Sequence, residues 1–142
     1  MGDEISILFP IDWREGSDVS DLIHDDLTGL MTPFFFYESA NRVISWARRR
    51  NQPISLISIN LEGISNDDLV RCARELSNEL RGGDLLARMA EEKFILLLLG
   101  DLTGANQLIF RLSNRIKPKL HFQSTELVTE EFLATALSRI NI

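Results

Sequence analysis

The fold of this chain is decided by the stretch Arg81-Gly82-Gly83-Asp84-Leu85-Leu86-Ala87-Arg88-Met89-Ala90-Glu91-Glu92-Lys93-Phe94, which leads into an apolar run over 95–99 and then Gly100-Asp101. Paired glycines end helices or form tight turns, and a short apolar run bounded by turn residues favours a buried strand. The stretch therefore predicts the end of a helix, a strand over 85–89, a tight turn, and a second strand over 94–99. Two such strands form a hairpin.

Caps and hydrophobic periodicity predict the elements on either side of the hairpin. Thr32 followed by Pro33 starts a helix that runs to Arg50, because proline suits the first helical position. A strand follows over 54–61. Asn66 is predicted to cap a second helix, which Gly82 or Gly83 ends, and Thr103 to cap a third, which ends before Pro118. A strand over 119–123 precedes a last helix that starts at Thr129, with two acids in its first turn, and buries Phe132.

The resulting order, α-β-α-β-β-α-β-α, predicts an α+β fold (an α/β sandwich), with helices packed on a single sheet. Residues 1–20 are predicted to be a lead-in, either an edge strand or a loosely packed segment, and residues 21–142 one domain. The side chains predicted to meet in one core are Leu76, Leu97, Leu112 and Leu137.

Composition and charge exclude some classes of function. The chain has 142 residues, a formal charge of −6 and one cysteine. The charge argues against nucleic-acid binding, which needs clustered basic side chains. No apolar run approaches the ~20 residues that span a bilayer, so we expect a cytoplasmic protein without membrane insertion. The cluster His24-Asp25-Asp26 is interpreted as helix capping rather than metal binding, since contiguous side chains point in different directions.

The segment Asp25-Asp26-Leu27-Thr28-Gly29-Leu30 matches the opening D-x-L-T-G-L of GGDEF domains, the diguanylate cyclases. From Asp25 to Asn141 the chain resembles this family, whose fold is a palm-like, mainly antiparallel sheet related to that of nucleotide cyclases. The five signature positions fall on residues 90–94, where both glycines have been replaced.

The resemblance also implies that the family's chemistry is lost. Asn60 stands at a metal-binding aspartate. Glu92 keeps the second metal carboxylate, but Lys93 places a cation beside it. Because Mg²⁺ prefers anionic oxygen ligands, these degenerate positions predict no metal site, no cofactor and no catalysis. The family's functional residues are also replaced at four further positions, Asn66, Ala90, Glu91 and Asn141, and these replacements likewise predict the loss of catalysis.

The Arg-x-x-Asp pattern at Arg81 and Asp84 is intact, and in the family it is the product-binding inhibitory site. The resemblance implies that Arg81, Asp84 and Arg88 bind cyclic di-GMP, with arginine donating to guanine and aspartate accepting from it. A structural interpretation stays open, in which Arg81 ends a helix and Asp84 is a turn acid. The alternative function is a nucleotide-independent interaction or dimerisation domain with a protein partner, and a residual one is a diguanylate cyclase.

Overall fold

The computed structural model describes residues 19–117 and 119–142, so most of the expected lead-in lies outside the described residues. The elements are α2 (Val19–Ile23), α3 (Pro33–Arg49), β1 (Ser55–Asn60), α4 (Asn66–Asn78), β2 (Leu85–Ala90), β3 (Lys93–Leu98), α5 (Leu102–Arg115), β4 (His121–Glu126) and α6 (Leu133–Arg139). From α3 onward this order is the predicted one. None of the helices in the described ranges is long and apolar enough to span a membrane.

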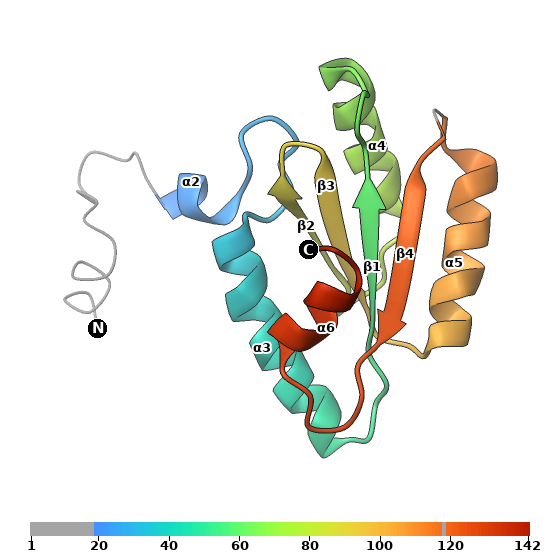
Figure 1. The fold of residues 1–142 in the computed structure, drawn as a ribbon. Coiled ribbons are helices and arrows are strands. Elements are labelled where there is room, and N and C mark those ends of the chain that lie inside the picture. The colour runs from blue at the N-terminus through green and yellow to red at the C-terminus, as the bar shows by residue number, and fades with distance from the viewer. Residues whose placement is uncertain (1–18, 118) are drawn as a thin grey trace.

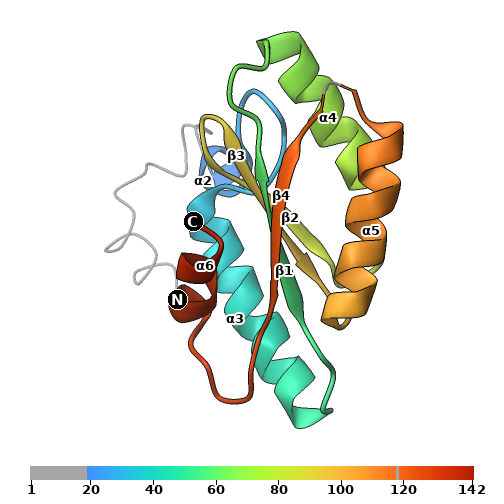
Figure 2. The same ribbon diagram turned by 45° about the vertical axis from the view of Figure 1, so that its right-hand side comes forward.

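One four-stranded sheet organises the molecule. Its strand order is β2-β3-β1-β4, and every neighbouring pair is antiparallel. Figures 1 and 2 show α3 and α6 on one face of the sheet and α4 and α5 on the other. The predicted α+β class, with an antiparallel sheet flanked by helices, is therefore confirmed.

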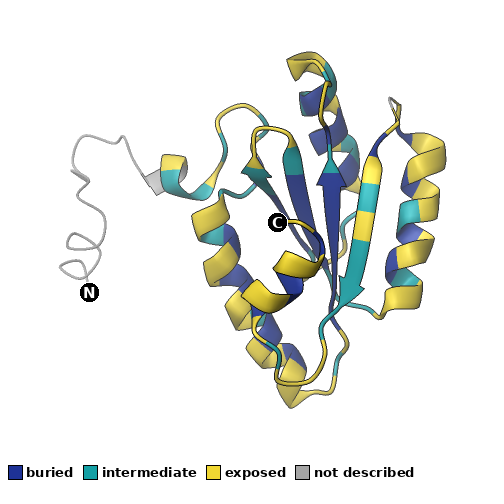
Figure 3. Cartoon of the chain, in the orientation of Figure 1, coloured by how far each residue is buried: buried dark blue, intermediate teal, exposed yellow. Residues whose placement is uncertain are grey.

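The core is divided by the sheet into two clusters. Successive side chains of a strand point to opposite faces, so Ile57 and Ile59 of β1 pack with α4 and α5, whereas Leu56 packs with α3 and α6. Because both faces of the sheet are covered, β1 and β3 are buried along most of their length, as Figure 3 shows. The prediction of one core is wrong in this respect: all four leucines are buried, but Leu76 and Leu112 belong to the first cluster and Leu97 and Leu137 to the second.

The predicted start of α3 is confirmed, because Thr32 accepts a hydrogen bond from the Phe35 amide and Pro33 is the first helical residue. Two other predicted caps are wrong by one or two residues. Ser65, not Asn66, caps α4, and Asp101, not Thr103, caps α5. In both cases a serine or aspartate one or two residues earlier in the chain caps the helix, and sequence alone does not rank such candidates.

The end of α4 also differs from the prediction. The helix ends at Asn78 with Glu79 as its C-cap, so the two glycines lie beyond it in a separate turn. The strand predicted over 119–123 is β4, which begins at His121 and continues to Glu126.

The start of the last helix is a further correction. It begins at Leu133 rather than Thr129, because Glu130 has a φ of +65°, in the left-handed region that a right-handed helix cannot contain. Glu131 instead accepts from the Val128 amide and pairs with Arg139. Phe132, predicted to be buried, is 81% exposed.

Candidate functional site

The segment 81–84 forms a tight turn that leads into β2. The Asp84 amide donates to the Arg81 carbonyl at 3.0 Å, and Gly83 has a φ of +94°. This backbone conformation favours glycine, and a Cβ atom at position 83 would lie 2.5 Å from Leu99 Cδ1, so the Leu99 side chain would also have to move. The turn therefore fixes the backbone between Arg81 and Asp84.

The Asp84 carboxylate accepts hydrogen bonds both within this turn and from the end of β3. Its Oδ2 accepts from the Arg81 amide and its Oδ1 from the Leu99 amide, each at 3.0 Å. Both oxygens keep a second lone pair, but the side chain already ties the turn to the end of β3. The Arg81 residue is exposed, and only its backbone takes part in this network.

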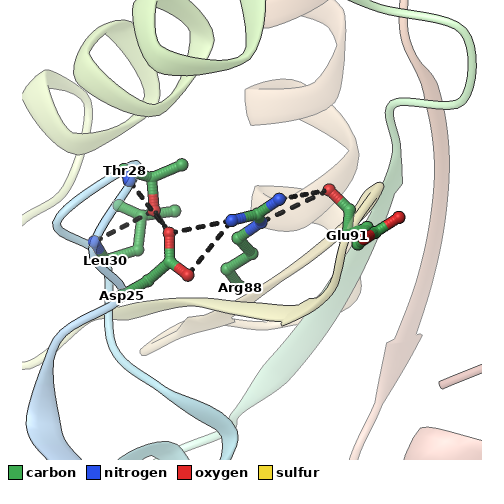
Figure 4. A network of polar contacts seen from close by, with 5 residues as sticks. All are labelled: Asp25, Thr28, Leu30, Arg88 and Glu91. Carbon is green, nitrogen blue, oxygen red and sulfur yellow. Dashed lines mark hydrogen bonds and ion pairs between the residues drawn. The ribbon is translucent and has the colours of Figure 1, made fainter. Parts of the chain in front are cut away.

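Arg88 lies on β2 in a different network, which Figure 4 shows. Its Nη1 donates to both carboxylate oxygens of Asp25 at 3.1 Å, while Nε and Nη2 donate to the Glu91 carbonyl at 3.3 and 3.0 Å. The two side chains of the ion pair are only 16% and 22% exposed. Arg88 is thus engaged in holding the fold, and its role as a ligand contact stays a prediction.

The loop that carries Asp25 is docked on the edge of β2. Met31 forms a parallel bridge with Ala87, and the Arg88 amide donates to the Met31 carbonyl at 3.0 Å. Within the loop, Asp25 Oδ2 accepts from the amide and the hydroxyl of Thr28 at 2.9 and 2.7 Å. Asp25 therefore stabilises a turn, not the helix start that we predicted.

These contacts lower the pKa of the Asp25 carboxyl group. Burial is the largest single influence and by itself raises the pKa of the carboxyl. The hydrogen bonds from Thr28 and the ion pair with Arg88 together outweigh burial, so the pKa of Asp25 lies below its usual 3.8. The carboxylate consequently stays charged and keeps its partners at neutral pH.

The positions at which the family would bind its metal ions lie at one end of the sheet. Asn60 is the cross-strand partner of Lys93, and Asn60 Oδ1 accepts from the Glu62 amide at 2.9 Å. Glu92 points elsewhere, with its Oε2 accepting from the Gly63 amide at 3.0 Å. Lys93 Nζ donates to the Asn141 carbonyl at 2.9 Å.

This arrangement does not fit a divalent cation. Hard cations such as Mg²⁺ need several free oxygen ligands, usually carboxylates. Here the Asn60 amide oxygen and the Glu92 carboxylate already accept backbone amides, and Lys93, the cross-strand partner of Asn60, brings an ammonium group to the same end of the sheet. Asn60 and Lys93 instead line a pocket of about 620 Å³, which residues 140–142 after α6 also line.

Sequence reasoning missed two features of this region. It did not find the pairing of Asp25 with Arg88, which are 63 positions apart. The signal was present in the intact Asp25–Leu30 motif, but a motif does not reveal its partner. It also missed His121, which lies directly across β1 from Lys93.

Comparison with known proteins agrees with this fold. The family model described as "Diguanylate cyclase, GGDEF domain" matches residues 22–133. No curated protein sequence matches the chain.

Among solved structures, a microbial GGDEF domain studied for its interaction with cyclic di-GMP has a TM-score of 0.73 and 18% identity, over 84% of this chain and 85% of that one. The GGDEF domain of DgcB from Caulobacter crescentus, in complex with c-di-GMP, has a TM-score of 0.70 and 14% identity, covering 83% and 82%. Diguanylate cyclase SiaD from Pseudomonas aeruginosa, in complex with its activator SiaC, has a TM-score of 0.74 and 21% identity, covering 99% and 61%.

Proposed function

Because the chain belongs to the GGDEF family of diguanylate cyclase domains, we propose that it is a signalling domain that does not synthesise cyclic di-GMP and binds it at Arg81 and Asp84. The observation that carries the loss of synthesis is the pairing of Asn60 with Lys93, where the family's reaction needs metal-binding carboxylates. We propose that the domain acts in the cytoplasm, as we expect from the sequence.

The loss of synthesis has a physical cause. Joining two GTP molecules brings together triphosphate charge that metal ions must neutralise. An amide at position 60 contributes no negative charge, and the Lys93 ammonium repels a cation at the same place. Glu92 would have to release the Gly63 amide before it could bind a metal.

Purified protein incubated with GTP and Mg²⁺ or Mn²⁺ is therefore expected to give no cyclic di-GMP above background. Asn60→Asp alone should not restore synthesis, because Lys93 still offsets the new carboxylate. Product formation is measured by chromatography. Turnover by the wild type that Glu92→Gln abolishes would show that the domain is a cyclase and overturn this part of the proposal.

Support for binding comes from the turn that carries Arg81 and Asp84. Its backbone is held by hydrogen bonds, and Gly83 tolerates the positive φ that the turn adopts, so binding should cost little backbone conformational entropy. The exposed Arg81 guanidinium can donate two parallel hydrogen bonds to the O6 and N7 of guanine. The second lone pairs of the Asp84 carboxylate can accept from guanine N1–H and N2–H₂.

Replacing Arg81 with alanine should weaken cyclic di-GMP binding roughly ten- to a hundred-fold, since truncating a charged hydrogen-bonding partner commonly costs about 1.5–3 kcal/mol. The melting temperature should stay nearly constant, because only the backbone of Arg81 takes part in the hydrogen bonds of the turn. Calorimetry measures the affinity, and Arg74→Ala, at an exposed position of α4, is the matched control.

Asp84→Asn is a less selective variant, because it also disturbs the bonds to the Arg81 and Leu99 amides. If the wild type shows neither heat nor thermal shift with cyclic di-GMP at about a hundred micromolar, the receptor proposal fails.

An interaction domain is then the alternative. One observation favours it: large apolar side chains are exposed, with Phe110 at 69% and Phe132 at 81%. Exposed aromatic groups of this kind are enriched in protein interfaces. Sedimentation of the wild type and of Phe110→Ala tests whether the exposed side of α5 that carries Phe110 forms a homodimer.

A further inference from the structure

The two edges of the sheet differ in how they are covered. β2 forms one edge, and the loop before α3 lies along it, because Met31 forms a bridge with Ala87 and bonds to β2 through both its amide and its carbonyl. β4 forms the other edge. Within the described residues β4 pairs only with β1, and none of the residues of β4 is buried. The outer side of β4 is therefore open.

The register of β4 shows which backbone groups point to this open side. The Leu127 amide donates to the Ile54 carbonyl at 2.9 Å, one residue beyond the ladder of β1 and β4. In an antiparallel pair, residues that bond to the neighbouring strand alternate with residues whose backbone groups point away from it. Counted back from Leu127, the amides and carbonyls of Phe122, Ser124 and Glu126 therefore point outward.

Most of these outward groups have no partner in the described part of the chain. The Glu126 carbonyl accepts from Arg139 Nη2 at 3.2 Å, which leaves its oxygen a second lone pair, and no other described contact reaches them. Proteins usually protect an open strand edge with charged side chains, proline or a bulge. From His121 to Thr125 the strand is regular and contains no lysine, arginine, acid or proline. β4 can therefore pair with another strand.

The helix next to this edge carries exposed apolar side chains. α5 lies alongside β4 in Figures 1 and 2. It runs antiparallel to β4, because the Leu102 amide donates to Glu126 Oε1 at 2.7 Å, while Asn106 Oδ1 accepts from Ser124 Oγ at 3.0 Å. Leu102, Asn106 and Phe110 are four residues apart, so they share one side of the helix, and all three are exposed. Phe110, at 69% exposure, thus lies close to the open edge.

The edge and the helix together are complementary to a second copy of the chain. With a two-fold axis at Ser124, each Ser124 pairs with its equivalent, and Phe122 pairs with Glu126 of the second copy. α5 then meets its equivalent at Asn106, the residue that contacts Ser124. We propose that the chain forms a homodimer in which two β4 strands join antiparallel into one continuous sheet and the two α5 helices pack against each other.

Distances and charges agree with this arrangement. Four residues of a helix rise about 6 Å and two residues of a strand about 7 Å. The axis at Ser124 therefore also places Phe110 opposite Leu102 of the second copy, and the contact buries two exposed apolar side chains. Glu126 is the only acid of β4, and it lies opposite Phe122 rather than opposite another acid.

This dimer is independent of cyclic di-GMP binding. Arg81 precedes β2, which forms the opposite edge of the sheet, so Arg81→Ala should leave dimerisation unchanged. A dimer that forms without dinucleotide binding would contradict only the receptor proposal.

Sedimentation equilibrium of the wild type and of two variants at Ser124 tests the strand pairing. We expect the wild type to be dimeric at about 100 µM. Ser124→Pro removes an outward amide that β1 does not use, so two symmetric hydrogen bonds are lost and the dimer should weaken roughly ten- to a hundred-fold. The matched control is Ser124→Ala, which also loses the contact with Asn106 but keeps the amide, and it should dimerise like the wild type.

A second pair of variants keeps the test valid if Ser124→Pro does not fold. Phe110→Ala should weaken the dimer, because it removes the contact with Leu102 of the second copy. Phe132→Ala, which truncates another exposed phenylalanine away from α5, should not weaken it.

Cysteine cross-linking tests the register of the two strands. Ser124→Cys should form an intermolecular disulfide, since the two Cα atoms would lie about 5.5 Å apart. Gln123→Cys should not, because the same register separates its two Cα atoms by about 8 Å. The native Cys72 is buried, so it does not compete.

Three results would overturn the proposal. One is a wild type that stays monomeric at about 100 µM, which would leave the edge to an extended segment of another protein. Another is a folded Ser124→Pro variant that dimerises as tightly as Ser124→Ala. The third is equal cross-linking of Ser124→Cys and Gln123→Cys, which would indicate chance collision rather than a paired edge.

Discussion

Replacing Leu97 with alanine is expected to lower the free energy of unfolding by about 2–5 kcal/mol, a large share of the stability of a domain of this size. Leu97 is fully buried in the cluster formed with α3 and α6. Truncation removes apolar contacts and leaves a cavity that the surrounding strands and helices cannot close completely. Urea denaturation followed by circular dichroism measures the change.

Phe132→Ala is the control for this prediction. Its side chain is 81% exposed, so the loss should stay within about 0.5 kcal/mol. Leu76→Ala probes the opposite cluster, and its effect should add to that of Leu97→Ala, because the two side chains do not share a cluster. A cost for Phe132→Ala equal to that of Leu97→Ala would contradict the assignment of faces.

Replacing Arg88 with alanine should destabilise the domain by roughly 2–4 kcal/mol, which is more than an exposed ion pair contributes and approaches the cost of breaking a buried one. The change leaves the mostly buried Asp25 carboxylate without its cation and the Glu91 carbonyl without two donors. It also frees the loop that docks on β2. Thermal and urea unfolding measure the loss.

The same pair predicts a dependence on pH. Since the pKa of Asp25 is lower in the folded state than its usual 3.8, the unfolded state binds more protons in this range. The stabilisation is fully present above the unfolded pKa and is lost as the pH falls through the folded pKa. In Arg88→Ala the ion pair no longer lowers this pKa, so the part of the acid destabilisation that comes from Asp25 should be smaller.

Arg71→Ala is a suitable comparison, because Arg71 also pairs with an aspartate, Asp68 at 2.7 Å, but both side chains are at least 36% exposed. Its removal should cost less than about 1 kcal/mol. If Arg88→Ala is no more costly than Arg71→Ala, the network in Figure 4 does not stabilise the loop, and Arg88 is free for a ligand.

Helices and strands were predictable here where the signal was local. Thr32-Pro33 is a cap and a fixed φ within two residues, and the start of α3 was correct. The start of α6 was wrong, because acids near a helix start are favourable only if the backbone is helical, and Glu130 is not. Helical periodicity from Thr129 predicts burial of Phe132, but this residue is the N-cap of α6 and its side chain is 81% exposed.

For the candidate site, too, local patterns were predictable and contacts between distant segments were not. The substitutions at Asn60 and Lys93 are visible in the sequence, and so is the Arg81–Asp84 pattern. The use of Asp84 as a tie to Leu99, and of Arg88 as the partner of Asp25, depends on contacts between segments far apart in the chain. No local pattern encodes such contacts.

The sequence by itself determined the order of elements from α3 onward and most of the apolar faces of the helices, since these follow from residue type and spacing. Through its resemblance to the family, the sequence also placed Asn60 where a metal-binding aspartate is expected. The tertiary structure decided that the core has two halves, because alternate residues of β1 and β3 face opposite helix pairs. It also brought Lys93, Asn60 and His121 into one pocket, because antiparallel register sets which residues of separate strands stand side by side.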